Sequence, residues 1–300
     1  MLRLTLLSFI AAVTLAPVAA AQAGDVPRNA FGQPDLTGLW TNATVTQLER
    51  DPKFGERLTM TKEEAARLRG DETGVMQING EYRTSFLVAP ADGQLPDLTP
   101  EAYVARAARL ADFPHGFGFG RGDNPESYTL AERCLRDFGS SSGPPMMPIG
   151  YNNTYQIMQT ADHVMILVEM IHDARIIPIA NGKEIKHRSG EIEQWMGDSI
   201  ARYESDTLVV ETTSFRPNQA FRGAPGNVTV TERFRRVSED QIVYSFEISD
   251  PKIYTAPIKA EIAMNATEGP LFEYACHEGN YSFANMLGGQ RVKERERAAQ

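Results

Sequence analysis

Ionisable side chains interrupt an apolar run at residues 164–171. Glu169 lies inside this run, and His172, Asp173 and Arg175 follow it. If the run is a β-strand, side chains alternate between its faces, so Glu169, Asp173 and Arg175 share one face and His172 lies on the other. A buried carboxylate is costly without a partner, so Glu169 is expected to pair with Arg175 or another arginine. The alternative is that Glu169 is a general base or anchors a ligand.

A second group of proton-transfer side chains lies near the C-terminus, in the run Glu273-Tyr274-Ala275-Cys276-His277-Glu278-Gly279-Asn280-Tyr281. Small-molecule sites often form at the mouths of β-barrels, where strands end. The imidazole of His277 titrates close to neutral pH in general, which suits acid–base catalysis. A structural hydrogen bond beside Cys276 is an equally good interpretation of His277.

Other polar groups fit the lining of a pocket. Asn153 and Tyr155 belong to the run Tyr151-Asn152-Asn153-Thr154-Tyr155, although Asn-Asn is also ordinary turn chemistry. Asp198 follows a glycine in Trp195-Met196-Gly197-Asp198-Ser199, and it also fits a turn. We expect His277 or Glu169 to be the catalytic base, with Tyr155, Tyr281 and Arg175 as stabilisers. Ligand contacts are expected from His172, Asn153, Asp198, Glu278 and Asn280.

Common catalytic motifs are absent from the sequence. It contains no GxSxG, no HExxH and no paired zinc-ligand spacing, and its five histidines are scattered. The alternating glycines of residues 115–122 fit no nucleotide-binding pattern, and Ser140-Ser141-Ser142-Gly143 is interpreted as a polar loop. We therefore expect neither a metal ion nor an organic cofactor. The net charge of −9 disfavours nucleic acid and anionic membranes as partners.

The N-terminus has the three parts of a secretory signal. Arg3 precedes an apolar stretch at residues 4–15, which is too short to span a bilayer, and Ala19-Ala20-Ala21 offers a cleavage site. A membrane anchor is the alternative, but no charged stop-transfer flank follows. We expect residues 1–21 to be removed, which leaves a periplasmic or secreted protein with no membrane segment.

Cys134 and Cys276 are the two cysteines of the chain. In an oxidising compartment they are predicted to form a disulfide. By closing a long loop in the unfolded chain, this bond would in principle stabilise the folded state by about 4–5 kcal/mol. Metal ligation and a catalytic thiol are the alternatives, but neither cysteine belongs to a CxxC pair.

Strand-forming sequence dominates from Tyr151 onward, where runs of β-branched or alternating residues are separated by short turns. The predicted strands are residues 155–159, 164–172, 207–213, 228–237, 242–249, 258–264 and 272–276. Such a succession predicts a mainly β fold: an antiparallel meander that closes into a lipocalin-like barrel or forms a sandwich.

The chain before residue 150 is expected to be helical and rich in loops. A capping box from Thr61 to Glu64 predicts a helix to Arg69, and Thr99 is expected to cap a helix that ends at Ala111. A third helix is expected to begin at Asn124 and to carry Cys134. Residues 22–288 are expected to form a single domain, and residues 289–300 a frayed, charged tail.

Several of these phrases together resemble a large family of exported proteins of proteobacteria and acidobacteria. The phrases are Tyr151-Asn152-Asn153 with Tyr155-Gln156, residues 162–175, 195–199 and 206–212, and Glu273 to Tyr281 with its ACHEGNY motif. The similarity covers residues 34–287. It implies a link to catabolism of lignin-type aromatic dimers by cofactor-independent lyases, and it assigns no catalytic residue.

The resulting hypothesis is an enzyme that binds a small aromatic or apolar molecule and uses general acid–base chemistry. A lyase that releases formaldehyde from an aromatic dimer fits this hypothesis. A non-catalytic, lipocalin-like carrier and a structural envelope protein are the alternatives.

Overall fold

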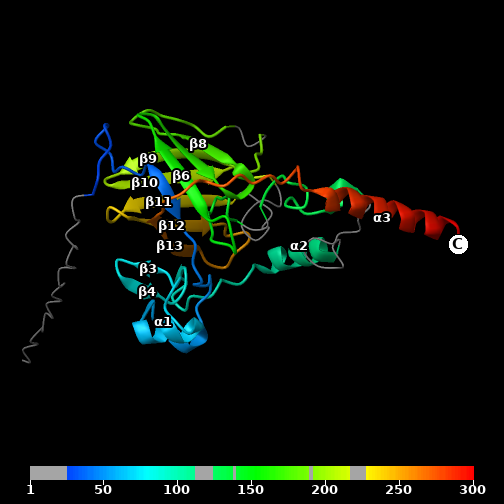
Figure 1. Ribbon diagram of the computed structural model, residues 1–300, viewed down its shortest axis with the longest axis horizontal. Coiled ribbons are helices and arrows are strands. Elements are labelled where there is room, and N and C mark those ends of the chain that lie inside the picture. The colour runs from blue at the N-terminus through cyan, green and yellow to red at the C-terminus, as the bar shows by residue number, and fades with distance from the viewer. Residues whose placement is uncertain (1–25, 112–123, 138–139, 189–191, 217–227) are drawn as a thin grey trace, which may run out of the picture.

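A computed structural model describes residues 26–111, 124–137, 140–188, 192–216 and 228–300. The expected signal segment and the whole glycine-rich loop at residues 115–122 therefore lie outside the described residues. Nine strands follow one another around a nearly closed, barrel-shaped sheet in the order β8-β7-β6-β1-β13-β12-β11-β10-β9 (Figure 1). The predicted mainly β fold with an antiparallel barrel is confirmed.

The strands of the barrel pair antiparallel, and their bounds are close to those predicted for five of them. The strands are β1 (Gly38–Thr41), β6 (Thr154–Gln159), β7 (His163–Val168), β8 (Ala174–Pro178), β9 (Asp198–Glu204), β10 (Thr207–Thr213), β11 (Thr229–Arg236), β12 (Gln241–Ser249) and β13 (Ile258–Ala266). A tenth strand, β5 (Leu87–Ala89), pairs with β13 beside this path. The barrel closes where β8 meets β9, through an isolated parallel bridge between Ile179 and Ala201.

Alternation along the strands builds the core of the barrel. In β12, Ile242, Tyr244, Phe246 and Ile248 are buried, as the sequence predicts. Val243 is buried as well, on the opposite face. A second, smaller layer covers the outer surface of the barrel at Val243. This face is therefore buried there, although the alternating pattern predicts that it is mostly exposed to solvent.

The smaller layer is a three-stranded sheet with one helix. Its strands are β2 (Thr59–Met60), β3 (Gln77–Ile78) and β4 (Glu81–Arg83), and α1 (Lys62–Arg69) begins with the predicted capping box between Thr61 and Glu64. Phe54, Met60, Ala65 and Val75 form a separate satellite core there. A short 3₁₀ turn, η1 (Pro52–Phe54), precedes the sheet. Strands of two or three residues leave too little pattern to predict, so this sheet was not expected.

The predicted strand at residues 164–172 is wrong beyond Val168. The chain turns through Glu169 and η3 (Met170–His172), where Ile171 and His172 have positive φ angles of 62° and 59°, and returns as β8. Positive φ is uncommon for a β-branched residue such as isoleucine, so the pattern gave no sign of this turn. The alternation of Glu169, Asp173 and Arg175 on one face therefore does not hold.

Four further expectations concern segments outside the barrel strands. The helix capped by Thr99 is confirmed as α2 (Pro100–Ala111). The third helix is wrong, since only a 3₁₀ turn, η2 (Pro125–Ser127), and further turns occupy residues 124–136. Residues 272–276 form no strand, and the frayed tail is instead part of helix α3 (Tyr281–Ala298).

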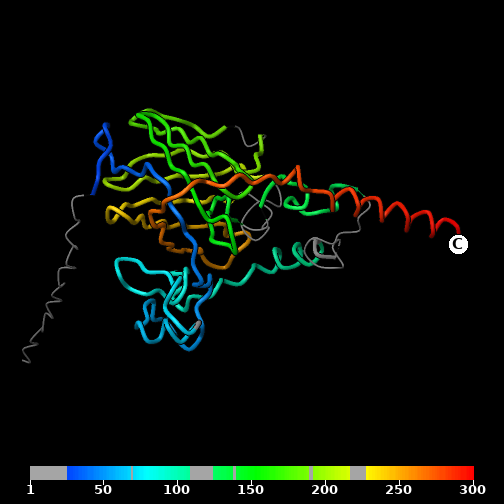
Figure 2. The backbone as a smooth tube through the Cα atoms, viewed as in Figure 1, coloured from blue at the N-terminus to red at the C-terminus, as the bar shows by residue number. Residues whose placement is uncertain are grey.

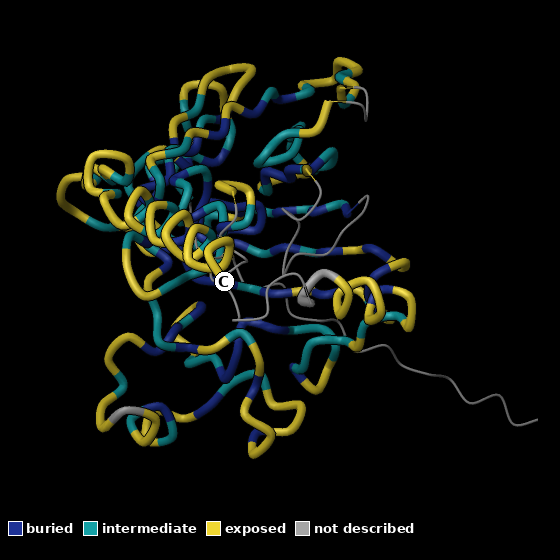
Figure 3. The backbone as a smooth tube through the Cα atoms, turned by 90° about the vertical axis from the view of Figure 1, so that its right-hand side faces the viewer, coloured by how far each residue is buried: buried dark blue, intermediate teal, exposed yellow. Residues whose placement is uncertain are grey.

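Helices α2 and α3 project from the same end of the barrel (Figures 1 and 2). The view onto that end separates them and shows α3 as largely exposed (Figure 3). In the described part of the chain, we find no helix with both the length and the apolar character needed to cross a membrane.

Candidate functional site

Residues 140–147 lie inside the barrel, at the end from which α2 and α3 project. We call this segment the plug. Ser141, Ser142 and Met146 are completely buried. The carboxylate of Asp137 accepts hydrogen bonds from the Ser141 hydroxyl at 2.9 Å and the Ser142 hydroxyl at 2.8 Å, and also from the Ser141 amide. The Met146 amide donates to the Tyr244 hydroxyl at 2.9 Å. The polar loop expected here is therefore a loop, but an interior one whose polar groups are bonded within the protein.

A buried ion pair spans the interior of the barrel. Arg175 in β8 donates through both terminal nitrogens to Glu232 in β11, at 2.9 and 2.5 Å, and both side chains are almost fully buried. The Tyr244 hydroxyl donates to the same carboxylate at 2.8 Å. Desolvation lowers the pKa of Arg175, but the charge and hydrogen bonds of Glu232 outweigh it and leave the pKa raised. Arg175, a predicted stabiliser, is thus engaged inside the barrel.

Tyr155 lies in the same interior network. Its hydroxyl donates to the Ser141 carbonyl at 2.8 Å and accepts from the Asn42 amide at 3.3 Å. Burial raises the pKa of Tyr155 well above the ordinary tyrosine value. The hydroxyl is therefore a neutral, internally bonded group that ties β6 to the plug.

Glu169 binds two backbone segments that lie far apart in the sequence. It is buried, and its carboxylate accepts from the amides of Thr154 at 3.1 Å and Phe272 at 3.4 Å. Among the described residues no ion pair joins it to Arg175. Glu169 thereby fastens residues 270–280, which we call the C-terminal arm and which run from the barrel to α3 (Figure 2).

Titratable groups gather where the plug, the β7–β8 turn and the C-terminal arm meet. We call Arg136, Asp137, Tyr151, Asp173 and Tyr274 the rim site. Desolvation raises the pKa of Asp173, Arg136 opposes the rise and Asp137 adds to it. Desolvation also raises the pKa of Tyr274 to about 12, together with its hydrogen bond to Tyr151 and the charge of Asp137. The site thus offers a half-buried carboxyl group that holds its proton more tightly than usual, and a phenol that is hydrogen-bonded to Tyr151; the charge of Asp137 acts on both groups.

One exposed aromatic ring belongs to the rim site, and a second lies two residues before Tyr274 in the chain. Tyr151 is 51% exposed and Phe272, whose amide is bound by Glu169, is 63% exposed. Exposed rings beside polar groups provide a platform on which a flat apolar molecule can stack. The arrangement can therefore combine ring stacking with proton transfer.

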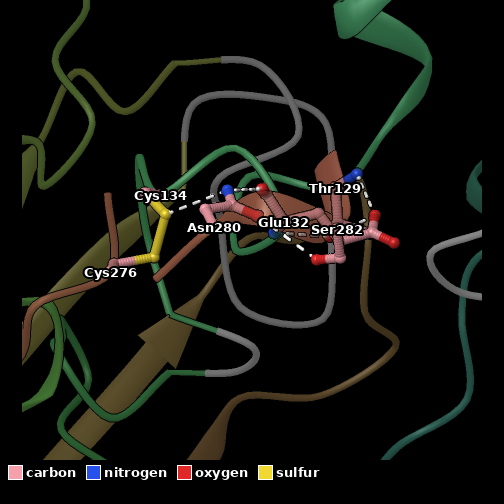
Figure 4. The surroundings of a disulfide bond; sticks show 6 residues. All are labelled: Thr129, Glu132, Cys134, Cys276, Asn280 and Ser282. Atoms are coloured by element: carbon pink, nitrogen blue, oxygen red, sulfur yellow. Dashed lines mark hydrogen bonds between the residues drawn. A yellow bond between two sulfur atoms is a disulfide. The ribbon is translucent and has the colours of Figure 1, made fainter. Parts of the chain in front are cut away.

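The disulfide between Cys134 and Cys276 is confirmed (Figure 4). It links the segment that leads into the plug with the C-terminal arm. Asn280 adds to this link, because its side-chain amide donates to the Glu132 carbonyl at 2.7 Å and to the Cys134 sulfur at 3.3 Å. The disulfide indicates an oxidising compartment outside the cytoplasm.

The remaining predicted site residues are not brought together. His277, Glu278 and Tyr281 are exposed around the start of α3, and His172 is exposed on the β7–β8 turn. Asn153 exchanges hydrogen bonds with the backbone of Ile149. Asp198 contacts His187 at 2.9 Å at the start of β9. No hydrogen bond between Glu169 and His277 is found in the described part of the chain.

Sequence reasoning missed Glu232, Asp137 and Arg136. Glu232 occupies an inward position of β11 between Val230 and Phe234, so the alternating pattern did contain the signal of a buried carboxylate. Arg136 and Asp137 lie in an irregular segment, where no periodicity separates inner from outer side chains.

A surface groove lies away from these residues. A groove of about 470 Å³ between the small sheet and the barrel is lined by Thr44, Gln77, Asn79, Gln241 and Asn265, among others. Across the described ranges, no three His, Cys, Asp or Glu side chains are grouped so as to hold a metal ion. Comparisons with protein-family profiles, characterised proteins and solved structures find no match to this chain.

Proposed function

We propose that the mature protein is a periplasmic or secreted enzyme that acts on a small aromatic compound by general acid–base catalysis, without an organic cofactor. The observation that carries the proposal is Asp173, a half-buried carboxyl group with a raised pKa that interacts electrostatically with Arg136 and Asp137 of the rim site. The same site includes Tyr274 and the exposed ring of Tyr151. A general base works best when its pKa lies near the working pH. The signal-like N-terminus, the disulfide and the family resemblance support the location and the class of substrate.

A lyase that releases formaldehyde fits these groups. In that reaction Asp173 takes the proton from a hydroxymethyl group, the adjacent carbon–carbon bond breaks, and formaldehyde leaves. The electron pair of the broken bond forms a carbon–carbon double bond with the neighbouring carbon, the aryl ether bond at that carbon breaks, and the ether oxygen leaves as a phenolate. The neutral phenol of Tyr274 is suited to donate a hydrogen bond to this oxygen as its charge develops.

The rim site is preferred over the barrel interior for a physical reason. Met146, Tyr155, Tyr244 and the pair of Arg175 with Glu232 occupy the interior. A lipocalin-like carrier needs a cavity at that position, so the packing argues against that alternative. The same packing favours the structural envelope protein as the second candidate.

The test is incubation of the oxidised protein, without residues 1–21, with a mixture of lignin-derived aromatic dimers, followed by mass spectrometry. We expect one dimer to be consumed and formaldehyde to appear in equal amount. Asp173→Asn should lower the rate by about 100-fold or more, the usual contribution of a general base. Asp206→Asn is the matched control, because Asp206 is exposed and pairs only with Arg28 among the described residues. Unchanged dimers would leave the structural role as the better proposal.

A further inference from the structure

Three arginines are deeply buried in the described part of the chain, and they differ in how their donors are used. Arg50 donates to the carbonyls of Gly55, Ala91 and Leu87, at 2.7 to 3.1 Å. Arg175 is bound through two nitrogens to Glu232. Each of these two keeps only Nε without a partner among the described residues. Both guanidinium groups therefore serve the fold.

Arg136 is different, because most of its hydrogen-bonding capacity is unused. The residue is 5% exposed, and among the described residues its guanidinium group makes one hydrogen bond, from Nη2 to the Gly143 carbonyl at 2.7 Å. Both Nε and Nη1 lack a partner within the residues that the structure describes. A buried cation with free donors is costly unless an anion or water completes its shell.

The nearest carboxylate does not complete that shell. Asp137 lies 3.7 Å from Arg136, beyond hydrogen-bond distance, and its oxygens are taken by Ser141 and Ser142. Asp173 is the other acidic neighbour, but desolvation favours its protonated form. Desolvation lowers the pKa of Arg136 as well, so the site does not fully compensate the charge.

We propose that Arg136 is the anion-recognition residue of the rim site and that the ligand is an aromatic compound carrying a carboxylate group. This inference rests on the proposed function, since it names the substrate class of the same site. Guanidinium groups bind carboxylates through short, charge-assisted hydrogen bonds. A singly charged group fits better than a phosphate dianion, because the nearby Asp137 carboxylate repels added negative charge.

The test compares two probes of nearly the same shape, the anionic 4-hydroxybenzoate and the neutral 4-hydroxybenzamide, in which an NH2 group replaces one carboxylate oxygen. Binding to the oxidised, full mature chain is measured by calorimetry. We expect the acid to bind about tenfold more tightly than the amide, the factor that corresponds to one charge-assisted contact. The preference should disappear in Arg136→Met and persist in part in Arg136→Lys. Arg202→Met is the control, since Arg202 is a surface residue paired with Glu204.

A second readout covers the case in which Arg136→Met fails to fold. In the unmodified protein, the NMR signal of the Arg136 Nε–H group should shift on titration with 4-hydroxybenzoate and not with the amide. Equal binding of the two probes would overturn the inference, as would an unmoved Arg136 signal under saturating acid, which indicates water only. Binding of the acid without turnover of any dimer would uphold the anion site and count against the proposed enzyme.

Discussion

Arg175 and Glu232 form a buried pair whose value lies in mutual compensation. Each charge has been removed from water, and each is acceptable only while the other is present. Glu232→Gln would leave the Arg175 cation uncompensated inside the barrel. We expect this change to lower the free energy of unfolding by about 3–5 kcal/mol, measured by denaturant titration.

A surface pair provides the control for this prediction. Arg202 and Glu204 are in contact at 2.6 Å, and both are about half exposed. Glu204→Gln is expected to cost at most about 1 kcal/mol, as exposed pairs do. A similar loss of unfolding free energy in the two variants would mean that the interior pair is solvated and does not stabilise the barrel.

Asp173 makes stability depend on pH in a direction opposite to that of a salt-bridged carboxylate. Desolvation raises its pKa in the folded state above the ordinary value of 3.8, so the folded state holds the proton more tightly. Stability is therefore lost as the pH rises from 3.8 through the raised pKa. Asp173→Asn should be more stable than the unmodified protein at neutral pH and show no such gain well below 3.8. Unfolding titrations at both pH values check this, and an equal difference at both would contradict it.

The residues of the rim site were only partly predictable. Asp173 and Tyr274 belong to the two runs rich in ionisable residues, but the sequence patterns there favour Glu169 and His277 as the catalytic groups. Burial, not residue type, distinguishes them: His277 is exposed, whereas Asp173 is partly desolvated. Burial at a turn depends on segments distant in the sequence, and no local pattern reports it.

At the scale of elements, α1 and the small sheet depend on their own satellite core. The capping box joins Thr61 to the amide of Glu64 at 3.2 Å, and the Glu64 side chain binds the Thr61 amide at 2.8 Å. Thr61→Ala should cost about 1 kcal/mol. Because the satellite core is separate, we expect the loss to appear as faster hydrogen exchange in residues 52–84.

The barrel strands are the reference in the same experiment. Exchange in β11 and β12 should remain unchanged in Thr61→Ala, since the change acts on local opening. If these strands also exchange faster, the small sheet and the barrel unfold as one unit, and the satellite core is not independent.

The elements were predictable in proportion to their regularity. β10 was predicted with its observed bounds, because Thr207 to Thr213 is a β-branched run between turn-forming residues. β8 was missed, since the turn at Ile171 and His172 joins two apolar strands without glycine or proline. β9 was missed as well, because its sequence, Asp198 to Glu204, alternates weakly.

At the scale of the whole molecule, the disulfide joins parts of the chain 142 residues apart. In the chain-entropy account, such a link contributes about 4–5 kcal/mol by restricting the unfolded chain. The double change Cys134→Ser and Cys276→Ser should therefore lower the free energy of unfolding by that order, measured by denaturant titration.

In the same double variant, we expect proteolysis to cleave the C-terminal arm before the barrel. An arm as resistant as the barrel would mean that Glu169 and Asn280 suffice to hold it.

The position of β1 has a consequence for the order in which the molecule is assembled. β1 lies between β6 and β13, so a strand at the start of the chain waits for one that is synthesised more than 200 residues later. The plug, at residues 140–147, precedes eight of the nine barrel strands in the sequence and is therefore synthesised before them. We therefore expect the strands to pair around the plug, and not to form an empty barrel that the plug enters afterwards. The closing of β13 against β1 is a contact of high sequence separation, which makes it a late and slow event on the folding pathway.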